Sequence, residues 1–158
     1  GEAERSNRTV MGGIVAHADL RDAENLDAVL DAHDAAGRGR FRGIRHAGSH
    51  ALHPEVLTIP GGAPAGLYAD PDFRAGAARL GERGLTYDTW HYHYQNRDFL
   101  ELARAVPETT MVLDHFGTPL GVGRYAGRRD EIFSEWAESI TELASRVARG
   151  EARLMCSN

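Results

Sequence analysis

Histidine, arginine and aspartate side chains follow short apolar runs at four places in this chain. The run 111–113 leads into Asp114 and His115 and then into a Gly-x-Pro turn. The other three runs lead into His17, into Arg45-His46, and into the segment Trp90-His91-Tyr92-His93-Tyr94-Gln95. Titratable residues at the carboxyl ends of successive strands are typical of the active sites of barrel and open α/β enzymes. The pattern therefore predicts an enzyme.

Two kinds of side chain in this set suggest particular chemistry. Imidazole can ligate a metal ion or polarise a carbonyl group, and guanidinium can bind a carboxylate through two hydrogen bonds. Arg42 and Arg45 are three residues apart, so on a strand they point to opposite faces. We expect one of them to face the pocket and favour Arg45, which lies nearer the carboxyl end. The alternative for either arginine is an ion pair with a flanking helix.

His91 and His93 are two residues apart and would share one face of a strand, so they could form a metal-binding pair. The alternative is that His93 and Gln95 contact substrate and His91 does not. His46 could line the rim of the pocket. His17 could line the pocket or stabilise the turn that follows it.

Alternating strand and helix patterns must position these residues. Helices are expected over Asp22–Ala36, from Pro71 to about Arg83 with Asp70 as N-cap, over Asn96–Ala105, and from about Arg128 onward. Strands are expected near residues 10–17, 41–46, 85–93 and 109–115. This order predicts an α/β fold with a parallel sheet. The irregular stretch 48–67 is long enough to suggest a functional lid or a mobile segment.

Composition excludes several classes of protein. The chain has 158 residues and a formal net charge of −5, so we expect one domain without a nucleic-acid footprint. No apolar stretch is long enough to span a bilayer, so no membrane partner is expected. A single cysteine, Cys156, excludes an internal disulfide and a thiolate zinc cluster, and a reducing cytoplasm is expected. All 18 basic residues are arginine, which excludes a lysine Schiff base.

An ordered set of segments resembles the amidohydrolase-related family of TIM-barrel hydrolases, in the branch of sugar-lactone and pyrone-dicarboxylate lactonases. The segments are 13–20 (GIVAHADL), 39–46 (GRFRGIRH), 90–95 (WHYHYQ), 112–119 (VLDHFGTP) and 127–131 (GRRDE). The resemblance implies a single partial domain over 1–158 with about four βα units, the second to fifth of a (β/α)₈ barrel. The first-strand His-x-His and the eighth-strand aspartate of the family have no counterpart here. The tail 147–158 looks unlike the family, so we expect an incomplete barrel.

The resemblance also implies roles for the candidate residues. His115 would be catalytic, as a metal ligand or as the group that polarises the carbonyl, and His93 would be a second catalytic residue. The expected substrate-binding residues are Arg42, Arg45, His46, Gln95 and His17. The family includes members that need a divalent metal such as zinc and members that act without one.

The expected reaction is hydrolysis of a lactone or related cyclic ester of a sugar acid or dicarboxylate. One alternative is a decarboxylase or hydratase on the same barrel, and another is a truncated fragment without activity. The expected partner is a small-molecule substrate, and a homo-oligomer is left open. The chain alone is expected to be inactive.

Overall fold

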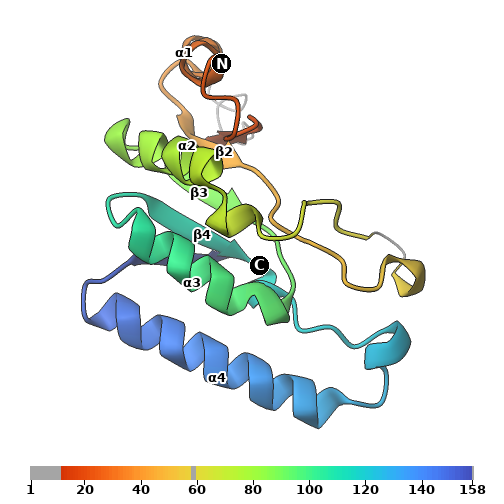
Figure 1. Cartoon of the computed structure of the whole chain (residues 1–158). Helices are drawn as coiled ribbons and strands as arrows, with labels where there is room; N and C mark the ends of the chain where they lie inside the picture. The colour runs from red at the N-terminus through yellow and green to blue at the C-terminus, as the bar shows by residue number, and fades with distance from the viewer. Residues whose placement is uncertain (1–11, 58–59, 158) are drawn as a thin grey trace, which may run out of the picture.

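The molecule is built on one parallel sheet whose strands follow each other in chain order (Figure 1). A computed structural model describes residues 12–57 and 60–157. The strands are β1 (Ile14–Ala16), β2 (Phe41–Arg45), β3 (Thr86–Thr89), β4 (Thr110–Asp114) and β5 (Arg153–Ser157). This is the α/β arrangement that the alternating pattern predicts.

Four helices connect the strands and lie on one face of the sheet (Figure 1). They are α1 (Leu26–Gly37), α2 (Pro71–Glu82), α3 (Asn96–Ala105) and α4 (Arg129–Ala148). Short 3₁₀ turns add η1 (Pro54–Val56), η2 (Leu67–Ala69), η3 (His93–Gln95), η4 (His115–Gly117) and η5 (Gly123–Tyr125). Connections between parallel strands are right-handed, which places successive helices on the same side.

The start of α2 shows how the sequence determines a helix boundary. The Asp70 carboxylate accepts hydrogen bonds from the backbone N–H groups of Asp72 (2.9 Å) and Phe73 (3.1 Å). Pro71 occupies the first helical position, where no backbone N–H is needed. The predicted N-cap is therefore confirmed.

Other boundaries differ from the predicted ones for local reasons. Helix α1 begins at Leu26 because residues 22–25 form a turn in which Asp22 accepts from the backbone and side chain of Asn25. Strand β3 ends at Thr89 because residues 93–95 form a 3₁₀ turn closed by Tyr92 and Gln95. Strand β1 covers only Ile14–Ala16 of the predicted 10–17, and residues 10 and 11 lie outside the described residues.

Strand β5 is an addition to the four predicted strands. Residues 153–157 pair with β4 along their whole length, from Thr110 with Arg153 to Asp114 with Ser157. Leu154 packs against the core. The tail that looked unlike the family therefore adds a parallel strand to the sheet.

The core lies between the sheet and the helices. Ile44, Tyr87 and Met111 are paired across β2, β3 and β4, and all three are fully buried. The helices contribute side chains that are buried to at least 97%: Leu30, Phe73, Leu80, Phe99 and Leu143. Each such apolar side chain stabilises the fold by about 1.5–3 kcal/mol. Packing of these residues in the core therefore stabilises the register in which the strands pair.

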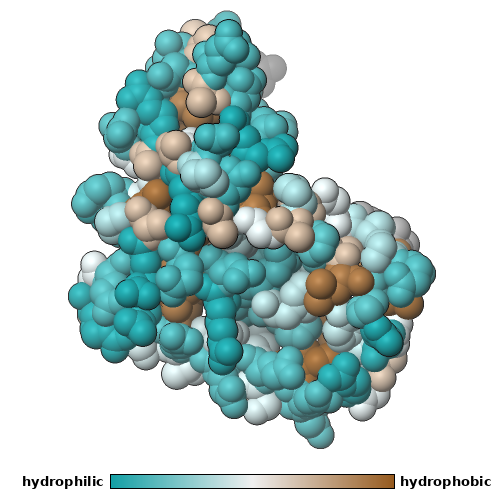
Figure 2. All heavy atoms as spheres, in the orientation of Figure 1, coloured by the Kyte–Doolittle hydropathy of each residue, from teal (hydrophilic) through white to brown (hydrophobic). Residues whose placement is uncertain are grey.

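The opposite face of the sheet carries a different row of residues. Arg45, Asp88, Val112 and Met155 are paired across β2 to β5 on that face. None of α1 to α4 covers them, and Met155 is 50% exposed. We call this side the uncovered face. By contrast, the helical face is mostly hydrophilic, with separate small hydrophobic patches (Figure 2). None of the helices in the described residues combines the length and apolar character needed to cross a membrane.

Candidate functional site at the carboxyl ends of the strands

Arg45 is the centre of a charged cluster on the uncovered face. Its Nε and Nη2 atoms donate to the two carboxylate oxygens of Asp88 at 2.6 and 3.1 Å. Nη2 also lies 2.6 Å from Asp114 Oδ2, and the Ser157 hydroxyl donates to Asp114 Oδ1. These residues follow one another at the ends of β2, β3, β4 and β5. We call this group, Arg45, Asp88, Asp114 and Ser157, the Arg45 cluster.

The Arg45 cluster combines buried carboxylates with an accessible guanidinium. The side chains of Asp88 and Asp114 are only 7% and 2% exposed, whereas that of Arg45 is 53% exposed. Burial raises the pKa of the Asp114 carboxyl, and the nearby Asp88 carboxylate raises it further, while Ser157 and Arg45 oppose the rise. Among the described residues, no hydrogen bond is recorded for Arg45 Nη1, so that nitrogen is open to a ligand.

Sequence reasoning missed Asp88 and Asp114 as site residues. The signal was present for Asp114, which precedes His115 at the end of a predicted strand. Asp88 lies inside a predicted strand, and only the register that pairs it with Arg45 brings the two charges together.

His115 follows β4 on a loop with an unusual backbone. His115, Phe116 and Thr118 have φ values of 50°, 52° and 38°, in the left-handed region that non-glycine residues rarely adopt. Such residues cost about 1–3 kcal/mol each and persist where the surroundings hold them. The Trp136 indole N–H donates to the Phe116 carbonyl at 2.6 Å. The His115 side chain is exposed at the end of the strand, where a ligand could reach it.

A buried chain of hydrogen bonds leads to Trp136, the residue that bonds to this loop. Tyr68 O–H lies 2.8 Å from His91 Nδ1, and His91 Nε2 lies 2.9 Å from Asn96 Oδ1. Asn96 Nδ2 donates to Ser139 Oγ, which donates to the Trp136 carbonyl. An amide oxygen only accepts, so His91 carries its proton on Nε2 and accepts from Tyr68.

Because both ring nitrogens of His91 are used inside the protein, this residue has no free position for a metal ion. Its burial lowers its pKa to about 4, so the ring is neutral at pH 7. The possible metal pair of His91 and His93 is therefore not formed in this geometry.

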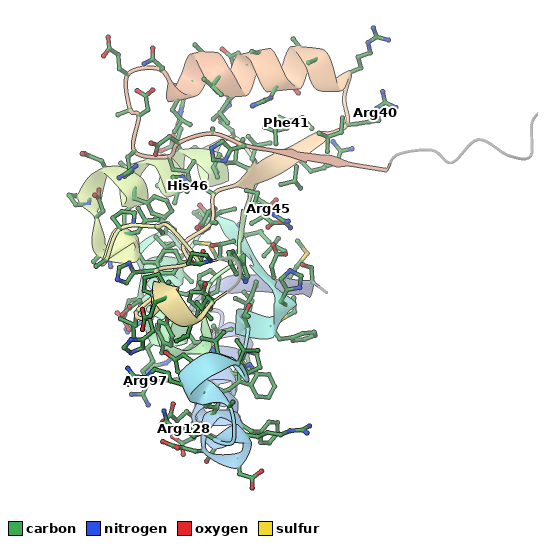
Figure 3. All side chains as sticks on the ribbon, turned by 90° about the vertical axis from the view of Figure 1, so that its right-hand side faces the viewer. Arg40, Phe41, Arg45, His46, Arg97 and Arg128 are labelled. Atoms are coloured by element: carbon green, nitrogen blue, oxygen red, sulfur yellow. The ribbon has the colours of Figure 1, made fainter. Side chains whose placement is uncertain are left out.

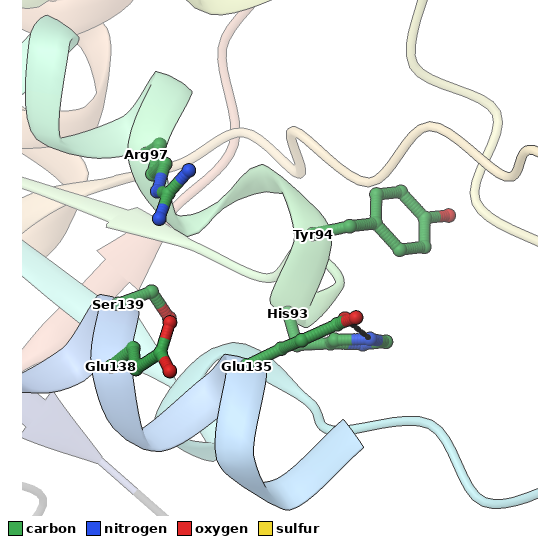
Figure 4. A pocket seen from close by; sticks show the side chains of 6 residues that line it. All are labelled: His93, Tyr94, Arg97, Glu135, Glu138 and Ser139. Carbon is green, nitrogen blue, oxygen red and sulfur yellow. Dashed lines mark ion pairs between the residues drawn. The ribbon is translucent and has the colours of Figure 1, made fainter. Parts of the chain in front are cut away.

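His93 lies in a pocket between η3, α3 and α4 (Figure 4), and its backbone N–H donates to the Thr118 carbonyl in the loop after β4. Its Nδ1 accepts from the Leu120 backbone N–H at 3.4 Å, and its Nε2 lies 3.9 Å from Glu135 Oε2. Burial lowers the pKa of His93, and Glu135 partly opposes this effect. The pocket measures 310 Å³ and includes Arg97, which lies far below Arg45 and His46 (Figure 3).

Gln95 anchors the long connection 48–67. Its Oε1 accepts from the His50 backbone N–H at 3.0 Å, and its Nε2 donates to the Gly48 carbonyl at 2.8 Å. Tyr94 O–H donates to the His50 carbonyl, and Gly61 N–H donates to Tyr92. These bonds, together with those from Leu52 N–H to the Tyr94 hydroxyl and from Gly48 N–H to the Trp90 carbonyl, tie the described part of this connection to the segment after β3. Both polar atoms of the Gln95 amide are therefore hydrogen-bonded to the backbone of this connection.

Of the remaining candidates, Arg42 is bonded to the backbone at the start of its own strand, whereas His17 and His46 lie at the strand ends. Arg42 Nη1 donates to the carbonyls of Gly39 and Phe41, so this arginine is folded back on its own strand start. His17 and His46 lie side by side after β1 and β2, with ring centroids 5.7 Å apart. The structure thus brings His17, Arg45 and His46 together at adjacent strand ends. His93 and Gln95 lie apart from this group, on the 3₁₀ turn η3.

A metal ion would need more ligands than this region offers. Within residues 12–57 and 60–157, no group of three or more His, Cys, Asp or Glu side chains is arranged to hold one. His115 contributes at most one ligand, whereas a catalytic zinc takes three from the protein. The Asp88 and Asp114 carboxylates, at the ends of β3 and β4, are paired with Arg45. The described residues therefore do not complete a metal site.

Comparison with known proteins gives a consistent result. Residues 3–148 match the family model described as "Amidohydrolase". The chain is 36% identical over 118 residues to an uncharacterized protein, y4mH, of Sinorhizobium fredii, a match that covers 74% of this chain and 38% of that protein.

Two solved structures have the same fold. Both are crystal structures of an amidohydrolase from Burkholderia multivorans, one with bound zinc and one with bound HEPES. Their TM-scores are 0.67 and 0.68 at 24% identity, and they cover 92% and 95% of this chain. This chain spans only 43% and 45% of theirs, so it corresponds to part of a longer barrel.

Proposed function

Because this chain belongs to the amidohydrolase family, we propose that it is part of a hydrolase acting on a lactone or related cyclic ester of a sugar acid or dicarboxylate. The observation that carries the proposal is the Arg45 cluster. A half-exposed guanidinium, fixed by two buried carboxylates, lies at the carboxyl ends of the strands, where barrel enzymes bind their substrates. This geometry suits a substrate with a carboxylate or several hydroxyl groups.

Each site residue has a proposed role. Arg45 binds a carboxylate or hydroxyl group of the substrate through the nitrogen that the aspartates leave open. His115 polarises the reacting carbonyl and stabilises the oxyanion that forms during attack by water. We assign the aspartate that activates water to the part of the longer relatives that this chain does not span. For that reason we propose that the 158-residue chain alone does not hydrolyse the substrate.

The role of Arg45 can be tested in a chimera. Residues 12–157 of this chain would replace the matching segment of the Burkholderia multivorans amidohydrolase, and hydrolysis of a panel of sugar lactones and carboxylated lactones would be followed by proton release. We expect Arg45→Lys to raise KM about 10- to 100-fold, because lysine keeps the charge but loses the planar fork.

A matched control is Arg153→Lys. Like Arg45, Arg153 lies on a strand of the sheet. It is the first residue of β5, and it pairs with Glu108 near the amino-terminal end of the strands. This variant should leave KM unchanged. Equal effects of the two substitutions, or a chimera that hydrolyses none of the lactones while retaining the parent fold, would contradict the proposal.

Zinc binding gives an independent prediction. We expect the purified 158-residue chain to retain less than one zinc ion per five molecules after dialysis against micromolar zinc, because the residues that the structure describes do not complete a ligand set. Elemental analysis of the dialysed protein measures this directly. Stoichiometric zinc that is lost in His115→Asn would show instead that the chain holds a metal site of its own.

A further inference from the structure

A cavity of 340 Å³ lies beyond the ends of β1, β2 and β3. Its lining includes His17, Arg21, His46, Ser49 and Trp90. The two imidazoles come from adjacent strand ends, and their hydrogen bonds determine what each presents to a ligand.

His17 presents a hydrogen-bond acceptor. Its Nδ1 lies 2.9 Å from the backbone carbonyl oxygen of Arg45. A carbonyl oxygen can only accept, so Nδ1 carries the hydrogen in this contact. In the neutral ring, Nε2 then holds a lone pair, and no described residue is recorded as a partner for it.

His46 presents the complementary group. Its Nδ1 accepts from the Leu20 backbone N–H at 3.2 Å, so the hydrogen of the neutral ring is on Nε2. Burial against Phe73 lowers the pKa of His46, and the Asp19 carboxylate at 3.8 Å partly opposes this. His46 is therefore neutral at pH 7 and offers one N–H donor.

The local backbone therefore holds the two histidines in opposite tautomers, with ring centroids 5.7 Å apart. Arg21 lies at the same cavity and is paired with Asp19 at 3.2 Å, an exposed pair that an anion could join. Acceptor, donor and cation together match a hydroxyl group adjacent to a carboxylate.

We propose that this cavity binds a 2-hydroxycarboxylate unit, whose hydroxyl donates to His17 Nε2 and whose carboxylate oxygen accepts from His46 Nε2–H. Sugar acids carry this unit at C1 and C2. The inference rests on the proposed function for its biological substrate. Binding of the unit, however, is measured on this chain without any hydrolysis, so either proposal can fail alone.

The tautomers are tested first. Long-range ¹H–¹⁵N NMR of the full chain at pH 7 distinguishes protonated from unprotonated ring nitrogens. We expect the hydrogen on Nδ1 in His17 and on Nε2 in His46. The same tautomer in both rings would overturn the proposal.

Binding is tested with three probes: glycolate, acetate, which lacks the hydroxyl, and ethylene glycol, which lacks the carboxylate. NMR titration should give a Kd for glycolate about tenfold lower than for acetate, and still weaker binding of ethylene glycol. Equal affinity for glycolate and acetate would overturn the proposal.

The variants His17→Asn and His46→Asn place an amide near the position of Nδ1, so each can keep the backbone hydrogen bond and loses only Nε2. His17→Asn should abolish the preference for glycolate over acetate, and His46→Asn should weaken the binding of both acids, while the backbone spectrum stays that of a folded protein. His53→Asn, in the connection after β2, is the matched control and should keep the preference.

If one of the first two variants unfolds, the corresponding His→Gln variant, which retains a polar group near Nε2, replaces it and should keep at least part of the preference. A preference for glycolate that is retained in His17→Asn, or unchanged affinity for both acids in His46→Asn, would contradict the assignment.

Discussion

Arg45→Met should lower the free energy of unfolding by about 2–3 kcal/mol at pH 7. The substitution leaves the buried carboxylates of Asp88 and Asp114 without their cation. Removing one partner of a fully buried ion pair costs about 3–5 kcal/mol, and the effect is smaller here because the guanidinium is 53% exposed. Urea unfolding followed by circular dichroism measures the difference.

Two further variants separate this cause from a loss of packing. Adding Asp88→Asn to Arg45→Met removes one unpaired charge and should restore at least half of the lost stability. Arg153→Met removes an arginine whose side chain is 57% exposed and whose partner Glu108 is 76% exposed, so it should change stability by less than about 0.5 kcal/mol. An Arg45→Met protein as stable as the Arg153→Met protein would show that the cluster does not depend on the cation.

Acidification should destabilise the protein through His91. Its pKa is about 4 in the folded chain and about 6.5 when unfolded, so the unfolded state binds the proton more readily. The stabilisation from keeping this ring neutral is fully present above pH 6.5 and is lost as the pH falls through 4. The expected loss from this residue is about 3 kcal/mol.

His91→Gln isolates the contribution, because glutamine does not titrate and still offers polar groups to Tyr68 and Asn96. The variant should be less stable than the parent at pH 7, and the difference should shrink toward pH 4. Asp114, whose raised pKa favours the folded state as the pH falls, acts in the opposite direction in both proteins. Parallel stability curves for the two proteins between pH 7 and 4 would refute the role of His91.

The features that were predicted correctly from the sequence are those that depend on interactions between residues close together in the chain. The Asp70-Pro71 helix start needs only side-chain capping within one turn, and the structure confirms it. The four predicted strands and the parallel sheet follow from short apolar runs and turn residues. The amidohydrolase resemblance, carried by segments such as 112–119, is confirmed by the match over residues 3–148.

The composition of the site depended on contacts that the sequence does not display. Asp88 meets Arg45 only because β2 and β3 pair in one particular register. His93 leaves the strand ends because Tyr92 and Gln95 close a 3₁₀ turn, which ends the period-two alternation expected for residues 85–93. Strand β5 was missed because its exposed Arg153 and Cys156 hid the single core residue, Leu154.

The sheet order, in which every strand is bonded to its neighbours in the chain, has a consequence for how the molecule acquires its structure. Asp88 pairs with Val112 at a separation of 24 residues, and Gly43 pairs with Thr86 at a separation of 43. No strand pairing in the described residues waits for a segment from the far end of the chain. Domains made during synthesis begin to fold from the amino-terminal side. Each βα unit can therefore dock on the preceding one as it leaves the ribosome, and the Arg45 cluster becomes electrostatically complete only when β4 arrives.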